Sequence, residues 1–174
     1  MKSSMTKLAI ALAAMVVGGS AAAGPVTTTF TVTASVGSEC VIGNPTNMAF
    51  GALKMLDGVS GGLNEEDNVA TATFDATCTN GTALPKLQFS SANGVGTFKM
   101  KGGISDDLMS YSLYTGGEPE QITHDTAAAF PGFEADGTVK TLTVSGRLTA
   151  GDKASKTIGA YTDTVTITAT FTPD

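Results

Sequence analysis

The sequence contains little of what most enzymes and nucleic-acid-binding proteins use. It has no tryptophan, one histidine and two cysteines, and only 15% of its 174 residues are charged. Acidic residues outnumber basic ones, which gives a formal net charge of −6, and the basic residues form no cluster. These features argue against binding to nucleic acids or to anionic membranes. With so few candidate ligands we expect no metal and no cofactor.

Long apolar runs are also lacking, with one exception at the start of the chain. Leu8 to Val17 is an unbroken apolar run that follows Lys2 and Lys7 and precedes the small residues Ala21 to Ala23. This order is typical of a secretory signal peptide. The run has ten residues, whereas a membrane span needs about 20. We therefore predict a signal peptide over 1–23, export through the inner membrane and no membrane-spanning segment.

What the remaining sequence does contain is alternation of apolar and hydroxyl-bearing residues. From Val26 to Val36 the even positions are apolar apart from Thr28, and the odd positions are threonine or serine. Ala70 to Cys78 and Tyr161 to Phe171 follow the same period, which is typical of strands with one buried face. In the last segment only Asp163 breaks the apolar set, and we expect it to be solvated near the start of the strand.

Further short strands are predicted between polar or glycine-rich connections. They are Leu84–Ser90, Met109–Tyr114 and Val139–Leu148. Asn80-Gly81 is a turn signal, and Ala127–Ala129 is predicted as a short helical turn. About seven strands in one domain of this length indicate an all-β protein, specifically a β-sandwich.

The two cysteines, Cys40 and Cys78, both fall on the core-facing parity of their segments. An even number of cysteines in an exported chain favours one disulfide. Two buried free thiols or a metal site are the alternatives.

No combination of residues predicts catalysis. Gly58 to Gly62 matches Gly-x-Ser-x-Gly in letters, but a nucleophile elbow needs a strand before it and a helix after it, and here it lies in a polar loop. His124 is expected to be a solvated surface residue, and Asn64 to Asn68 to be a charged loop tip without calcium-loop spacing. We therefore expect a binding or structural protein and not an enzyme, with no catalytic residues.

Four segments in order carry a resemblance to a known family. They are Thr28–Ala34 running into Cys40, Phe74–Thr82, Leu108–Tyr114, and Val144–Leu148 followed by Gly159–Thr168 with its Gly-x-Tyr-x-Asp-Thr-Val run. The chain resembles the spore coat protein U domain, which is shared by major subunits of archaic chaperone–usher (Csu-type) pili. The family often carries a tryptophan between Gly116 and Gly137, where this chain has none.

The resemblance implies an incomplete immunoglobulin-like β-sandwich, completed by donor-strand complementation. In that arrangement residues 24–36 form a donor strand and residues 37–174 form the pilin domain. The implied partners are other copies of the chain or related pilins, a periplasmic chaperone and an outer-membrane usher. The implied localisation is the periplasm in transit and then a cell-surface pilus. The implied function is surface attachment and biofilm formation.

The candidate site residues fall into two sets. The donor-strand residues are Val26, Thr28, Phe30, Val32 and Ala34; the strand expected to border the groove contributes Tyr161, Val165, Ile167 and Phe171. The alternative is a self-complete secreted β-sandwich, either a coat protein or a carbohydrate-binding module. Periodicity alone does not separate the two, because an in-domain strand and a donated strand bury the same face.

Overall fold

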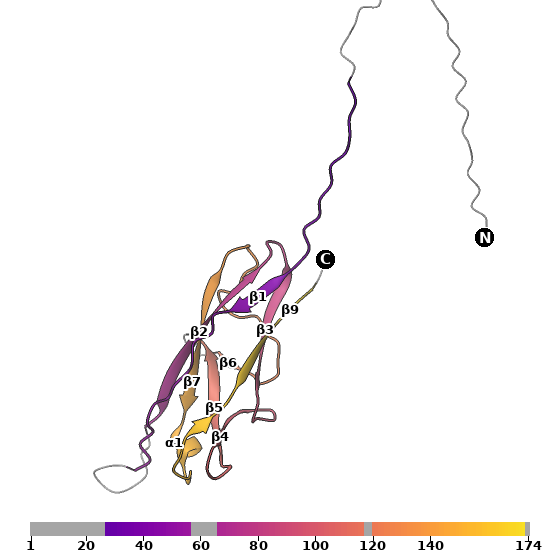
Figure 1. Cartoon of the computed structure of the whole chain (residues 1–174). Coiled ribbons are helices and arrows are strands. Elements are labelled where there is room, and N and C mark those ends of the chain that lie inside the picture. The colour runs from indigo at the N-terminus through magenta and orange to yellow at the C-terminus, as the bar shows by residue number, and fades with distance from the viewer. Residues whose placement is uncertain (1–26, 57–65, 117–119, 173–174) are drawn as a thin grey trace, which may run out of the picture. The chain divides into compact units, whose positions relative to one another are not determined.

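The computed structural model describes residues 27–56, 66–116 and 120–172 (Figure 1). The predicted signal peptide, Val26 and the Gly58–Gly62 loop lie outside the described residues. The chain divides into an N-terminal segment that ends at Ala34 and a compact unit that begins at Ser35. Each is described by itself, and the unit from Ser35 onward is called the domain.

The domain is built from two antiparallel sheets. The larger sheet has the spatial order β1 (Cys40–Gly43), β2 (Asn68–Cys78), β7 (Lys140–Leu148), β5 (Leu108–Thr115), β4 (Phe98–Gly102) and β8 (Tyr161–Thr162), with β6 (Gln121–Ile122) also paired to β5. The smaller sheet consists of β3 (Ala83–Ser91) and β9 (Val165–Thr172). The one short helix is α1 (Ala150–Lys153) in the described part of the chain, where no helix is long and apolar enough to cross a membrane. The all-β prediction is confirmed.

The alternation in β2 places one face of the larger sheet in the core. Phe74, Ala76 and Cys78 are buried, and the residues between them are only partly covered. The ring of Phe74 lies edge-on to Phe89 of β3 and to Phe130, with centroids 6.1 and 6.0 Å apart. These contacts join the two sheets, as expected for facing apolar surfaces about 10 Å apart.

Two of the stretches between the predicted strands contain β-structure. The stretch from Ser91 to Asp107 includes β4, which pairs with β5. The helical turn predicted at Ala127–Ala129 is wrong, because Ala128 forms an antiparallel bridge with Leu87 of β3. Pairing with an existing strand edge outweighs the weak helix preference of three alanines.

The predicted strand from Tyr161 to Phe171 is divided into two. Tyr161 and Thr162 pair with β4 in the larger sheet, whereas Val165 to Thr172 pair with β3 in the smaller one. The chain therefore changes sheets at Asp163 and Thr164. This crossing brings both sheets together at one end of the domain.

Candidate functional site: a cleft beside strand β9

The two edges of the smaller sheet differ. The outer edge of β3 is covered by residues 125–128, since Leu87 and Ala128 exchange backbone hydrogen bonds of 2.9 and 3.0 Å and Asp125 N–H donates to Phe89 O. Along β9, none of the described residues pairs with the edge that faces away from β3. β9 is therefore an edge strand with unpaired backbone groups, which can template the addition of another strand.

An open cleft of about 560 Å³ lies beside this edge. One wall is formed by residues 45–50 and the other by Tyr161 to Ile167. The core residues that line it are Phe74, Phe89, Met100, Tyr111, Leu113 and Val144. The cleft thus reaches into the core between the two sheets. Contiguous exposed apolar surface of this kind is rare in soluble proteins and marks an interaction site.

The wall at residues 45–50 continues from β1 and is fixed to β2 through Thr46. Thr46 N–H donates to Thr73 O at 2.8 Å, and Thr73 N–H donates to the Thr46 hydroxyl at 2.7 Å. Farther on, Met48 and Phe50 pack over Gly146 of β7. A Cβ at Gly146 would overlap with the Met48 sulfur and would lie 2.8 Å from the Phe50 ring. Glycine at this position therefore leaves room for the cleft wall.

A polar cluster closes one end of the cleft, and Asp163 is at its centre. Its Oδ2 accepts hydrogen bonds from Tyr111 Oη and Ser91 Oγ, both at 2.7 Å. Its Oδ1 accepts from Asn93 Nδ2 at 3.0 Å and from Thr164 N–H at 2.8 Å. The expectation that Asp163 is solvated is wrong: it is half-buried, and each carboxylate oxygen accepts two bonds. Burial and the neighbouring Asp163 raise the pKa of Tyr111, so this phenol stays a donor.

The prediction that His124 is a solvated surface residue is also wrong. His124 is buried, its ring lies 5.0 Å from that of Phe98, and its Nε2 accepts a hydrogen bond from Ser91 N–H. The Ser91 hydroxyl donates to Asp163 rather than to His124. Ser91 thus links His124 and Asp163 in a hydrogen-bonded network close to the point where the chain changes sheets.

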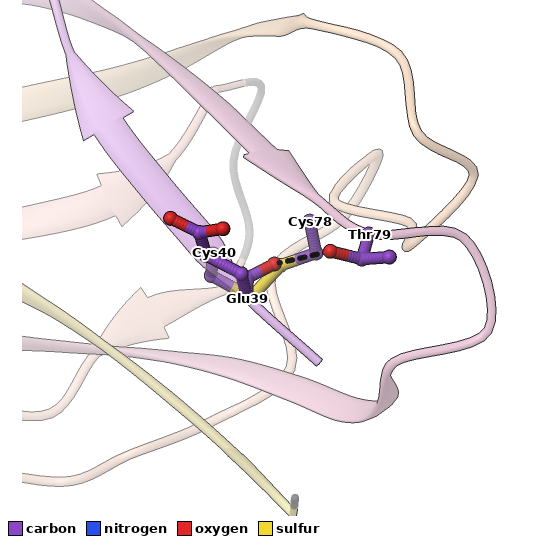
Figure 2. The surroundings of a disulfide bond; sticks show 4 residues. All are labelled: Glu39, Cys40, Cys78 and Thr79. Carbon is purple, nitrogen blue, oxygen red and sulfur yellow. Dashed lines mark hydrogen bonds between the residues drawn. A yellow bond between two sulfur atoms is a disulfide. The ribbon is translucent and has the colours of Figure 1, made fainter. Parts of the chain in front are cut away.

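The predicted disulfide is confirmed. Cys40 and Cys78 are bonded at a directly opposed pair of β1 and β2. Figure 2 shows the neighbouring Thr79 hydroxyl directed at the carbonyl oxygen of Glu39, a bond of 3.3 Å. The start of the domain is therefore attached to the end of β2 both covalently and by hydrogen bonds.

The N-terminal segment, described from residue 27, has no secondary structure up to residue 39. The side chains on its apolar face are exposed, with fractions of 87% for Phe30, 80% for Val32 and 82% for Val36. Thr28 and Ala34 are exposed as well. We call residues 24–36 the arm. Its apolar face is present in the sequence, but no strand pairs with its described residues.

Of the four residues expected to border a groove, three line the cleft. Tyr161, Val165 and Ile167 belong to its wall, whereas Phe171 is half-buried and lies beyond it. The opposite wall was not predicted from the sequence. Met48 and Phe50 have the same parity as Cys40 and Ile42, with the polar residues Asn44 and Thr46 between them. This shared parity is the signal that could have identified the wall.

A second hollow, of about 650 Å³, lies between the end of β5, residues 130–132 and the start of β7. Threonines, Glu120 and Lys140 line it together with apolar atoms. Within the described residues, no group of histidine, cysteine and acidic side chains is arranged to hold a metal ion. The cleft beside β9 is the better candidate site, because it alone joins an unpaired strand edge to the core.

Comparison with protein families identifies the family of this chain. A search of curated proteins found no matching relative. The family model described as the Spore Coat Protein U domain matches residues 26–168. That family includes subunits of chaperone–usher pili and is a structural family rather than a family of enzymes. With the matched region covering most of the two-sheet domain and most of the arm, the chain belongs to the Spore Coat Protein U domain family.

Proposed function

We propose that this protein is a rod subunit of a chaperone–usher pilus and polymerises by donor-strand exchange. The arm of one subunit enters the cleft of the next and pairs with the open edge of β9. The observation that carries the proposal is the combination of an exposed apolar arm with an apolar cleft beside an unpaired strand edge. Strand addition of this kind combines backbone hydrogen bonds with pockets for alternate side chains.

The chemistry of the arm matches that of the cleft. Phe30 and Val32 would leave water for a cleft lined by phenylalanine, methionine, leucine and valine side chains. Burying each large apolar side chain contributes about 1.5–3 kcal/mol, and pairing covers the exposed edge of β9. A contact that joins different surfaces of identical subunits gives a fibre when it does not close into a ring.

The remaining parts of the proposal follow from this assembly. A subunit with an open apolar cleft needs protection before it polymerises, which a periplasmic chaperone provides, and an outer-membrane usher then delivers it to the cell surface. Export requires the predicted signal peptide. The resulting fibre supports surface attachment and biofilm formation. The alternative is a self-complete secreted sandwich, such as a coat protein or a carbohydrate-binding module.

Electrophoresis without boiling separates the two functions. We expect the full mature chain to give a ladder of multimers that heat dissociates, because each link is a non-covalent strand. Deletion of Gly24–Val36 should abolish the ladder while the domain keeps its disulfide and its β-sheet circular dichroism. Phe30→Asp should also reduce the ladder, whereas the matched variant Thr31→Asp, on the opposite face of the arm, should reduce it far less. A lone monomer band from the full chain would favour the self-complete sandwich.

A further inference from the structure

We propose that the polar cluster around Asp163 sets the register of the incoming arm, so that Ala34 of one subunit lies opposite Asp163 of the next. This inference rests on the proposed donor-strand exchange. It specifies which residues of the arm lie opposite which residues of β9 and assigns Asp163 as a positioning residue.

The two ends of the domain are defined by β3 and its neighbours. At one end, Cys40 is bonded to Cys78, and a short turn after Cys78 leads to Ala83, which pairs with Thr172. The start of β1 and the end of β9 therefore lie together (Figure 1). At the other end, Ser91 is the last residue of β3 and Asn93 lies two residues after it. Both donate hydrogen bonds to Asp163. The cleft lies along the chain from Tyr161 to Ile167, and Asp163 is at the opposite end of β3 from Ala83 and therefore from the start of β1.

The direction of the incoming arm follows from this arrangement. Every domain continues into its own arm at the Cys40 end, so in an open fibre the next domain must sit at the Asp163 end. Only Gly37, Ser38 and Glu39 separate the arm from β1. The C-terminal part of the arm must then lie near Asp163, and the arm runs antiparallel to β9. Antiparallel pairing is also slightly more stable per residue than parallel pairing.

A subunit cannot fill its own cleft in this direction. From Asp163 to Thr172 the strand advances nine residues, which is about 30 Å at 3.4 Å per residue. From Ala34 to Cys40 there are six steps, which extend to at most about 22 Å. Self-filling would have to run parallel to β9. Strand direction therefore distinguishes a neighbour's arm from the subunit's own.

The cluster then selects one register from those that parity allows. Because Asp163 is only half-buried, a bulky apolar side chain placed against it would remove the remaining water from the carboxylate and supply no donor. Ala34 is the smallest residue on the apolar face of the arm. With Ala34 there, Val32 lies opposite Val165 and Phe30 lies opposite Ile167, two residues that line the cleft. With Thr28 there instead, Phe30 and Val32 would lie beyond the start of β9.

Cysteine cross-linking on the solvent face tests the register. In the proposed pairing Thr31 lies opposite Thr166, and both side chains point away from the core, so Thr31→Cys with Thr166→Cys should give a ladder that survives boiling and collapses with reductant. The matched pairs Thr29→Cys with Thr166→Cys and Thr33→Cys with Thr166→Cys represent shifts of two residues and should cross-link several-fold less. A stronger ladder from either shifted pair would overturn the register. A cross-linked monomer would indicate self-filling, and absence of a heat-sensitive ladder from the unmodified chain would overturn donor-strand exchange itself.

Substitutions in the arm, alone and combined with a substitution of Asp163, test the role of that residue. Ala34→Leu should reduce the ladder several-fold, because leucine would meet the carboxylate, whereas Val32→Leu, over the apolar cleft, should leave it nearly unchanged. Combining Ala34→Leu with Asp163→Ala should restore multimers, and the cross-linking maximum should widen to include the shifted pairs. If Ala34→Leu polymerises as well as Val32→Leu, or if Asp163→Ala leaves the cross-linking pattern unchanged, Asp163 does not set the register.

Discussion

Strand β2 and the arm share one sequence pattern and differ completely in burial. Both alternate apolar residues with threonine or other polar residues. In β2 the apolar face is covered, with Phe74 only 2% exposed, whereas Phe30 in the arm is 87% exposed. β2 has a strand on each side and the smaller sheet over its inner face. An alternating sequence therefore specifies which face of a strand is to be buried, whereas residues outside that segment determine what covers the face.

Paired alanine substitutions make this difference measurable. We expect Phe74→Ala to lower the free energy of unfolding by about 3–5 kcal/mol, because it leaves a cavity in the core. Phe30→Ala should change the same quantity in the unpolymerised subunit by less than about 0.5 kcal/mol, but should lower the yield of multimers. Urea unfolding and unboiled gels measure the two effects. Equal losses of stability would mean that the arm belongs to the domain's own core.

The disulfide marks the boundary between the two regions. Replacing both Cys40 and Cys78 by alanine opens a loop of 38 residues and should lower the free energy of unfolding by about 4 kcal/mol in the chain-entropy model. The neighbouring Thr79→Ala, which removes only a side-chain hydrogen bond, should cost about 1 kcal/mol. A double-cysteine variant as stable as the wild type in urea would contradict this expectation.

Gly146 tests whether the cleft wall depends on close packing. Gly146→Ala should destabilise the domain by about 1–3 kcal/mol through overpacking and should displace Met48 and Phe50, thereby weakening polymerisation. Gly43→Ala is the matched control, because a Cβ there meets nothing within 4 Å. Thermal unfolding and multimer yield measure the pair. Equal unfolding temperatures and multimer yields for the two variants would show that Met48 and Phe50 can move aside without cost.

Asp107 provides the smallest test, through pH. It accepts hydrogen bonds from Thr157 N–H at 3.0 Å and from Tyr161 Oη at 3.4 Å, and the bonds from Thr157 in particular lower its pKa to about 2. A depressed pKa in the folded state adds stability above the unfolded value of 3.8, and this stability is lost as the pH falls toward 2. Asp107→Asn should therefore show a shallower loss of stability between about pH 4 and pH 2, measured by urea unfolding. Equal slopes of unfolding free energy against pH in the wild type and in Asp107→Asn would contradict this role of Asp107.

The sequence predicted the parts of the fold in which local pattern and tertiary contacts agree. The parity of Cys40 and Cys78 indicated a shared core face, and Met109–Tyr114 and Val139–Leu148 correspond closely to β5 and β7. β4 was missed because its alternation of apolar residues and lysine covers only five residues between glycines. Short segments of this kind become strands when an existing edge pairs with them.

The candidate site was less predictable, because it depends on contacts between distant segments. Asp163 was expected to be solvated near the start of its strand and His124 to be solvated in a polar loop. Asp163 is instead half-buried and His124 is buried, and Ser91 binds each of them. Nothing near either residue in the sequence reports the approach of Ser91. The walls of the cleft come from residues about 115 positions apart, a juxtaposition that only the sheet topology produces.

The position of the disulfide has a mechanical consequence. A pull on the arm reaches the domain at Cys40, where β1 alone would be peeled from β2 one residue pair at a time. The covalent bond at the first pair instead transmits the load to Cys78 and so to β2, which is held between β1 and β7. Tension on a fibre assembled as proposed should therefore leave β1 paired with β2, so that the load passes to the contact between the arm of one subunit and the cleft of the next.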